Sequence, residues 1–188
     1  MECAKTFLTA EIQNPSCTPD LKELLQQTLR SLELGWWNEL GQSLLKLVER
    51  EDAQNGLWQL YKNVIEKIAS NLNPLTLVDI SRWIANTSKD FSVAISFLKE
   101  IGMVVNSNID ASIWVKVLIG KIERTRKNVG GAKSIVDEIE IDLDRVTNLR
   151  VQFEVEKLKR RLTDGKHTLP YETQLGLKVK PHKWHPQV

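Results

Sequence analysis

The segment between Gly56 and Ile80 constrains the fold of this chain more than any other part of the sequence. Its apolar residues recur at steps of three and four, which places them on one stripe of an α-helix. They are Leu57, Leu60, Tyr61, Val64, Ile65, Ile68, Ala69 and Leu72. Asn73 then follows as a helix cap, and Pro74 fits the first turn of a second helix, where no amide donor is needed. The segment therefore predicts two helices joined by a tight turn.

Similar signals predict helices before and after this hairpin. Thr18-Pro19-Asp20 is typical of a helix start, and Gly35 ends that helix immediately before another begins at Trp36-Trp37. Two helices joined so tightly pack antiparallel. Beyond about Ala85, the pair Thr87 and Asp90 has the spacing of a capping box, with aspartate in place of the usual glutamate, and a long helix follows.

Two more helices complete the pattern, one over about residues 109–127 and one that follows a predicted turn at Gly130-Gly131. No segment alternates polar and apolar residues as a strand does. The hairpins begin about thirty to forty residues apart, a range typical of tetratricopeptide-like repeats. We therefore predict an all-α fold, an irregular right-handed α-solenoid of stacked antiparallel helix hairpins.

The sequence divides into four predicted parts. Residues 1–17 contain Asn14-Pro15-Ser16, a loop signal, and are predicted to be a flexible N-terminal segment. Residues 18–149 form the solenoid domain, and residues 150–164 continue as a charged helix whose apolar residues are too irregular to define a deep face. Residues 165–188 carry three prolines and no sustained period, so we expect a disordered basic tail.

The composition excludes several classes of protein. A net charge of +2 over 188 residues gives no general attraction to nucleic acid or membrane. The N-terminus has no apolar signal-peptide core, and no apolar run approaches the roughly 18 residues of a membrane span. Cys3 and Cys17 lack the spacing of a metal or redox motif, which favours free thiols in a reducing compartment. We expect the protein in the cytoplasm and nucleus.

Catalysis finds little support in the sequence. Residues 1–150 contain no histidine, the usual base for a serine or cysteine nucleophile, and no glycine-rich phosphate loop. His182 and His185 have a spacing that suits a metal, but prolines flank them and no further ligand is near. An acidic run is expected to scatter around the solvent face of its helix. It comprises Asp137, Glu138, Glu140, Asp142 and Asp144. We therefore expect no catalytic, cofactor-binding or metal-binding residue, no cofactor and no small-molecule substrate.

Three other groups of residues have two interpretations each. One group is Lys157-Leu158-Lys159-Arg160-Arg161. It is either a nuclear-localisation or phosphate-binding cluster, or a set of basic residues of the kind favoured at a helix C-terminus. Asn86-Thr87-Ser88 has the form of a glycosylation site, although helix capping is the better interpretation without a secretion signal. Five tryptophans form core stripes or a partner-binding surface, and Trp37 and Trp58 are the best interface candidates. The five are Trp36, Trp37, Trp58, Trp83 and Trp114.

Several segments, read in order, resemble one known family. They are Gly35-Trp36-Trp37-Asn38-Glu39-Leu40, Gly56 to Ile65, Asn73-Pro74-Leu75-Thr76-Leu77-Val78-Asp79-Ile80, Val93 to Leu98, Gly131-Ala132-Lys133 and Ile135 to Glu140. Together they are similar to the N-terminal half of the family of non-ATPase regulatory subunit 13 of the 26S proteasome. The resemblance covers roughly Leu21 to Leu149, and the block from Asn73 to Ile80 is its most specific part.

This resemblance implies a non-catalytic scaffold of the regulatory-particle lid, with other lid subunits as protein partners and a role in ubiquitin-dependent protein degradation. It also implies a PCI domain, a helical stretch joined to a winged helix, after the solenoid. No winged helix is recognisable after Leu149, so we expect a shortened form that lacks the PCI domain. No contact residue of the family transfers to this chain, because the main assembly surfaces of the family lie in that domain.

Two other functions compete with the lid subunit. The first is a free helical-repeat adaptor that holds a peptide in a groove of the solenoid, with the basic tail as an appended ligand. The second is nucleic-acid binding through Lys157 to Arg161 and the tail, where Tyr171 and Trp184 are available for base stacking. We expect protein partners, and neither nucleic acid nor membrane.

Overall fold

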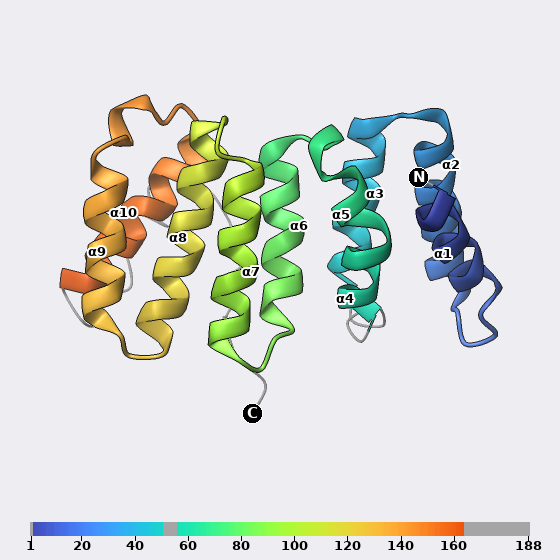
Figure 1. Ribbon diagram of the computed structural model, residues 1–188, viewed down its shortest axis with the longest axis horizontal. Coiled ribbons are helices and arrows are strands. Elements are labelled where there is room, and N and C mark those ends of the chain that lie inside the picture. The colour runs from blue at the N-terminus through green and yellow to red at the C-terminus, as the bar shows by residue number, and fades with distance from the viewer. Residues whose placement is uncertain (1, 51–55, 164–188) are drawn as a thin grey trace.

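The computed structural model describes residues 2–50 and 56–163, and within these ranges the chain is helical and contains no strand (Figure 1). The longer helices are α1 (Glu2–Gln13), α2 (Pro19–Leu34), α3 (Trp37–Val48), α6 (Pro74–Asn86), α7 (Phe91–Val104), α8 (Ile109–Thr125), α9 (Val129–Glu140) and α10 (Leu149–Thr163). Between α3 and α6 lie α4 (Leu57–Leu60), a π-helical turn η2 (Tyr61–Ile65), α5 (Glu66–Ile68) and a 3₁₀ turn η3 (Ala69–Asn71). A second 3₁₀ turn, η4 (Leu143–Arg145), precedes α10.

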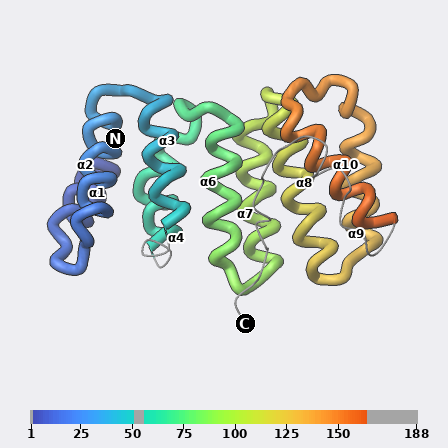
Figure 2. Tube along the Cα trace, turned by 180° about the vertical axis from the view of Figure 1, so that it is seen from behind, coloured from blue at the N-terminus to red at the C-terminus, as the bar shows by residue number. Residues whose placement is uncertain are grey.

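The helices stack side by side along the long axis, from α1 and α2 at one end to α9 and α10 at the other (Figures 1 and 2). Helix α2 packs on α1 and α3, α3 packs on α6, and α6 packs on α7 and α8. Helix α8 in turn contacts α7, α9 and α10. Their apolar stripes merge into one continuous core, as stacking requires. The predicted all-α solenoid of antiparallel hairpins is confirmed.

Local cap chemistry sets two of the predicted boundaries. Gly35 ends α2 in the left-handed region at φ 67°, where the amide of Trp36 donates to the Ser31 carbonyl. Asn73 begins α6, and its side-chain oxygen accepts from the amides of Leu75 and Thr76 at 3.1 and 3.3 Å. Both boundaries lie where the sequence predicts them, because a cap depends only on residues within one turn.

The prediction of a flexible segment over residues 1–17 is wrong for most of its length. Residues Glu2–Gln13 form α1, which buries Ala4 and Leu8 against α2 and η2. The two side chains are four residues apart, so they lie on one face of the helix. The loop signal at Asn14-Pro15-Ser16 marks only the turn that follows α1.

Two predicted helix boundaries also need correction. Asp90, and not Thr87, caps α7, since its side chain accepts from the Ser92 amide at 2.7 Å. Thr87 instead follows the end of α6, and its hydroxyl donates to the Ile84 carbonyl at 2.7 Å. The turn between α8 and α9 is at Lys127 and Asn128, because Asn128 caps α9. The predicted turn at Gly130-Gly131 is therefore the first turn of α9.

Residues Leu149–Thr163 form helix α10, and the predicted lack of a deep apolar face in this segment is wrong. Val151, Val155 and Leu158 lie at steps of four and three, and all three are buried against α8 and α9. Figure 2 shows α10 lying over these two helices. Helix α10 is thus part of the stacked fold. The predicted disordered tail, 165–188, lies outside the described residues.

Candidate interaction surfaces

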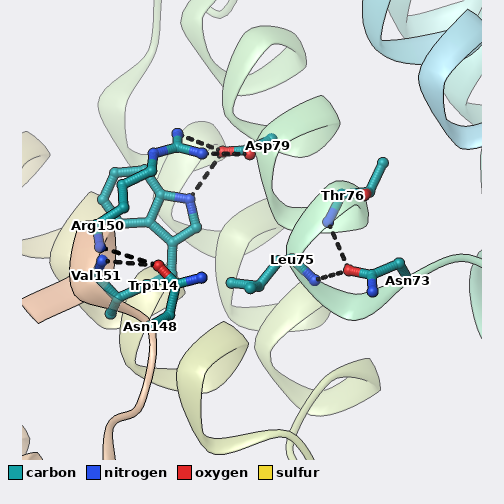
Figure 3. A network of polar contacts seen from close by, with 8 residues as sticks. All are labelled: Asn73, Leu75, Thr76, Asp79, Trp114, Asn148, Arg150 and Val151. Atoms are coloured by element: carbon teal, nitrogen blue, oxygen red, sulfur yellow. Dashed lines mark hydrogen bonds and ion pairs between the residues drawn. The ribbon is translucent and has the colours of Figure 1, made fainter. Parts of the chain in front are cut away.

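A polar network joins α6, α8 and α10 (Figure 3). The carboxylate of Asp79 accepts a hydrogen bond from the Trp114 indole N–H at 2.9 Å. The same carboxylate accepts two hydrogen bonds from the Arg150 guanidinium, at 2.7 and 2.9 Å. Paired donors in this fork geometry fix both distance and orientation. Asp79 therefore connects three helices through one side chain.

Trp114 lies at the centre of this network. Its ring is almost fully buried, and the charged ends of Lys121 and Arg150 lie 4.7 and 5.2 Å from its centroid. Burial disfavours the charged form of Arg150, but the hydrogen bonds and charge of Asp79 outweigh it and raise its pKa. The predicted core role is confirmed for Trp114, which holds helices together.

A second ion pair, more buried than the first, joins α8 and α10 further along both helices. Lys121 donates to Glu154 at 2.5 Å, and both side chains are largely buried. Burial alone would raise the pKa of Glu154, yet the charge and hydrogen bond of Lys121 outweigh burial and lower it. The polar groups of this region thus serve helix docking.

The loop before α10 is also held by a single carboxylate. Asp110, in the first turn of α8, accepts from the Thr147 amide and hydroxyl, both at 2.8 Å, and from the Asn148 amide at 3.0 Å. Asn148 then caps α10 by accepting from the amides of Arg150 and Val151. This network directs the chain back across α8. No local sequence signal marks Asp79, Asp110 or Arg150 for these roles.

A groove with an aromatic floor lies between the α4–α5 segment and α7. Its volume is about 770 Å³, and its floor includes Trp58, Tyr61 and Phe97. These rings meet edge to face, with the Tyr61 and Phe97 centroids 4.8 Å apart and the Trp58 and Phe97 centroids 5.0 Å apart. Tyr61 opens the π-helical turn η2, an irregularity that is frequent at functional sites.

The groove walls carry polar and charged side chains, including Cys3 of α1, Lys62, Glu66 and Glu100. Burial, followed by the Glu66 and Glu100 carboxylates, raises the pKa of Tyr61, so its hydroxyl stays protonated. An apolar floor with a few polar groups on the walls is suited to a peptide segment. The sequence marks Trp58 as an interface candidate, but it assigns Tyr61 only to an apolar stripe and does not single out Phe97.

The remaining tryptophans divide between core and surface. Trp37 and Trp83 are half-buried and pack on the core. Trp36 is 49 % exposed at the start of α3, so the core prediction does not hold for it. Because Trp37 takes the inward position, its neighbour Trp36 is turned towards solvent.

The acidic run holds ion pairs. Glu138 lies 3.7 Å from Lys116, Glu140 lies 3.0 Å from Lys159, and Asp142 accepts from Arg145 at 2.7 Å. Among the residues that the structure describes, no three His, Cys, Asp or Glu side chains are grouped as metal ligands would be. His182 and His185 lie outside the described residues.

The other predicted features have local roles. Lys157 and Lys159 of the basic cluster are paired with acids of α10, at 3.9 and 3.4 Å from Glu154 and Glu156. Cys3 and Cys17 are free thiols, as predicted. Over the described ranges, no helix has the length and apolar character needed to cross a membrane.

Stacked hairpins with a peptide-sized groove and docking networks define a helical-repeat protein. The family of PSD13 N-terminal repeats matches residues 26–157, and the chain belongs to this family, the N-terminal region of proteasome non-ATPase subunit 13. The match begins within α2 and ends within α10. It therefore extends beyond Leu149, where the predicted resemblance ended. Membership implies protein–protein contact with other proteasome components and supports a lid-subunit role.

Proposed function

We propose that this chain is a non-catalytic structural subunit of the regulatory-particle lid of the 26S proteasome, acting in ubiquitin-dependent protein degradation in the cytoplasm and nucleus. The observation that carries the proposal is the family match, which spans most of the stacked helices. The packing agrees with a scaffold role, since the buried charges of Asp79 and Glu154 serve contacts between helices. A scaffold acts through the shape of its surface, and these contacts join α6, α8 and α10.

Co-sedimentation tests this function. The tagged full chain, expressed in cells, is expected to migrate with lid subunits in a density gradient and to crosslink to them. The test variant is Asp79→Ala, which weakens the attachment of α10. This variant should still be expressed but should be recovered less with the lid. Recovery of the wild-type chain solely as a free species of monomer size would contradict the proposal. Fractionation of the same cells checks the cytoplasmic and nuclear location. The shortened form without a PCI domain stays a prediction.

The aromatic groove favours a second candidate function, a free helical-repeat adaptor that holds a peptide. Val93 of α7 lines the groove and is 48 % exposed, so Val93→Glu should change the groove without disturbing the core. Val129 of α9 is 46 % exposed and provides a matched control, Val129→Glu. The adaptor function requires one non-proteasomal partner that Val93→Glu loses and Val129→Glu keeps. Capture of lid subunits alone, by all three proteins, would exclude it.

A further inference from the structure

Helix α10 crosses the second half of α8 at one end of the solenoid. The two helices run in the same direction, since Trp114 meets Arg150 near their starts and Lys121 meets Glu154 further on. Gly120 and Leu158 are also in contact, because a Cβ atom at Gly120 would lie 2.7 Å from Leu158. Arg124 lies one turn beyond Gly120 and Arg161 about one turn beyond Leu158, each on the same helix face as its neighbour in this contact, so the two arginines come close together.

Three cations occupy this end, which we call the basic end: Arg124 and Lys127 at the end of α8, and Arg161 at the end of α10. Lys127 and Arg161 are exposed and Arg124 is partly buried. Within the described part of the chain, none of the three makes an ion pair. Burial lowers the pKa of Arg124, and the nearby positive charge of Arg161 lowers it further.

The acids near the basic end are already engaged with other groups. Glu123 accepts two hydrogen bonds from Arg126, at 2.6 and 2.8 Å, and another from the Asn128 side chain at 2.7 Å. Glu154 is held by Lys121. Glu156 lies 3.4 Å from Lys159. Among the residues up to 163 that the structure describes, no nearby carboxylate is left to balance the charge of the basic end.

Helix dipoles account for only part of this charge. The C-terminal ends of two helices together carry roughly one negative charge, about half from each, whereas the basic end carries three cations. Lys127 also adopts φ 66°, in the left-handed region that glycine occupies without cost. A helix end designed only for stability would have glycine there. The basic end thus contains a strained backbone at Lys127 and two like charges close together, Arg124 and Arg161.

We propose that the basic end is a docking surface for an acidic segment of a protein partner, a run of Asp and Glu side chains that supplies the missing counter-charges. Charge complementarity is the argument for this occupant. Carboxylates match the fork of an arginine, and two arginines lie side by side here. Nucleic acid is the competing ligand, and the test below includes it. The inference does not depend on entry into the lid.

Binding of a fluorescein-labelled octaglutamate peptide to the full chain, followed by fluorescence anisotropy at low salt, tests the proposal. The wild type should bind, and added salt should weaken the complex. The double variant Arg124→Gln/Arg161→Gln should lower the affinity about tenfold, since each exposed charge contributes about two- to fivefold. Arg30→Gln/Lys99→Gln removes the same charge from exposed positions of α2 and α7 and should change affinity less than about twofold.

A second variant separates binding from folding. Lys127→Gly removes a cation and relieves the left-handed strain, so it should raise the urea midpoint and still lower affinity about two- to fivefold. A purely structural role for Lys127 would leave the affinity unchanged. The proposal fails if octaglutamate does not bind, if both double variants lose affinity equally, or if a single-stranded DNA of eight phosphates binds more tightly than the peptide.

Discussion

Replacement of Asp79 should separate the two hydrogen-bonding roles of this carboxylate. In Asp79→Ala, the Trp114 indole N–H loses its acceptor while its side chain is only 2 % exposed. An unsatisfied buried donor costs about 1–3 kcal/mol. Arg150 loses its ion pair too, but its side chain is 53 % exposed, so that loss adds only about 0.5–1 kcal/mol. The total expected loss is about 1.5–4 kcal/mol.

Asp79→Asn is the matched variant. The amide oxygen still accepts from Trp114, and only the charge opposite Arg150 is lost, so the expected cost falls to about 1 kcal/mol. Urea unfolding followed by circular dichroism measures both variants. With a slope of about 2 kcal/mol per molar urea, Asp79→Ala should lower the midpoint by about 1–2 M. Amide hydrogen exchange in α10 should also accelerate.

A double-mutant cycle completes the experiment. Arg150→Gln alone should cost less than Asp79→Ala, and the pair should show a coupling energy of about 0.5–1 kcal/mol. Equal costs for Asp79→Asn and Asp79→Ala would show that the hydrogen bond to Trp114 contributes little. A cost below about 1 kcal/mol for Asp79→Ala would refute the argument that this carboxylate connects the three helices.

Three further substitutions test the packing around α8. Gly120→Ala inserts a methyl group against Leu158, so overpacking should cost about 1–3 kcal/mol of stability, partly offset by about 1 kcal/mol of helix propensity. Urea unfolding of Gly120→Ala, Leu158→Ala and the double variant measures the coupling. The summed stability losses of the two single variants should exceed the loss of the double variant. Lys127→Gly should stabilise by about 0.4–1 kcal/mol in the same assay, and a loss would contradict the strain argument. Glu154 has a lowered pKa in the fold, so its stabilisation is present above its ordinary pKa of 4.5 and is lost as pH falls below that value. Glu154→Gln should flatten this acid-side fall of the urea midpoint, and an unchanged pH profile would argue against the role of Lys121.

Cap chemistry and helical periodicity are legible in the sequence alone. Thr18, Gly35 and Asn73 mark helix ends through contacts within one turn, and the structure places those ends accordingly. The sequence misleads where competing local signals are present. The spacing of Thr87 predicts that it caps a helix, but Asp90 is the residue that caps α7. The pair Gly130-Gly131 predicts a turn, but the turn is at Lys127, which has a positive φ.

The candidate surfaces are much less predictable. Trp58 can be chosen from its position near a helix start, but the groove also needs Phe97 from α7 and the π-helical turn at Tyr61. A π-helical turn has no sequence signature comparable to a cap. The basic residues of α10 are visible as a cluster, yet the structure pairs Lys159 with acids and leaves Arg161 beside Arg124.

The sequence by itself determined that the chain is all-α, where most of its helices begin and end, and which family it resembles, because these properties depend on residues a few positions apart. The tertiary structure alone decided that α1 and α10 belong to the stacked fold and that a groove and a basic end are formed. The physical reason is distance along the chain. Asp79 meets Trp114 from 35 residues away and Arg150 from 71 residues away, and only the stacking of helices determines which of many polar residues become partners.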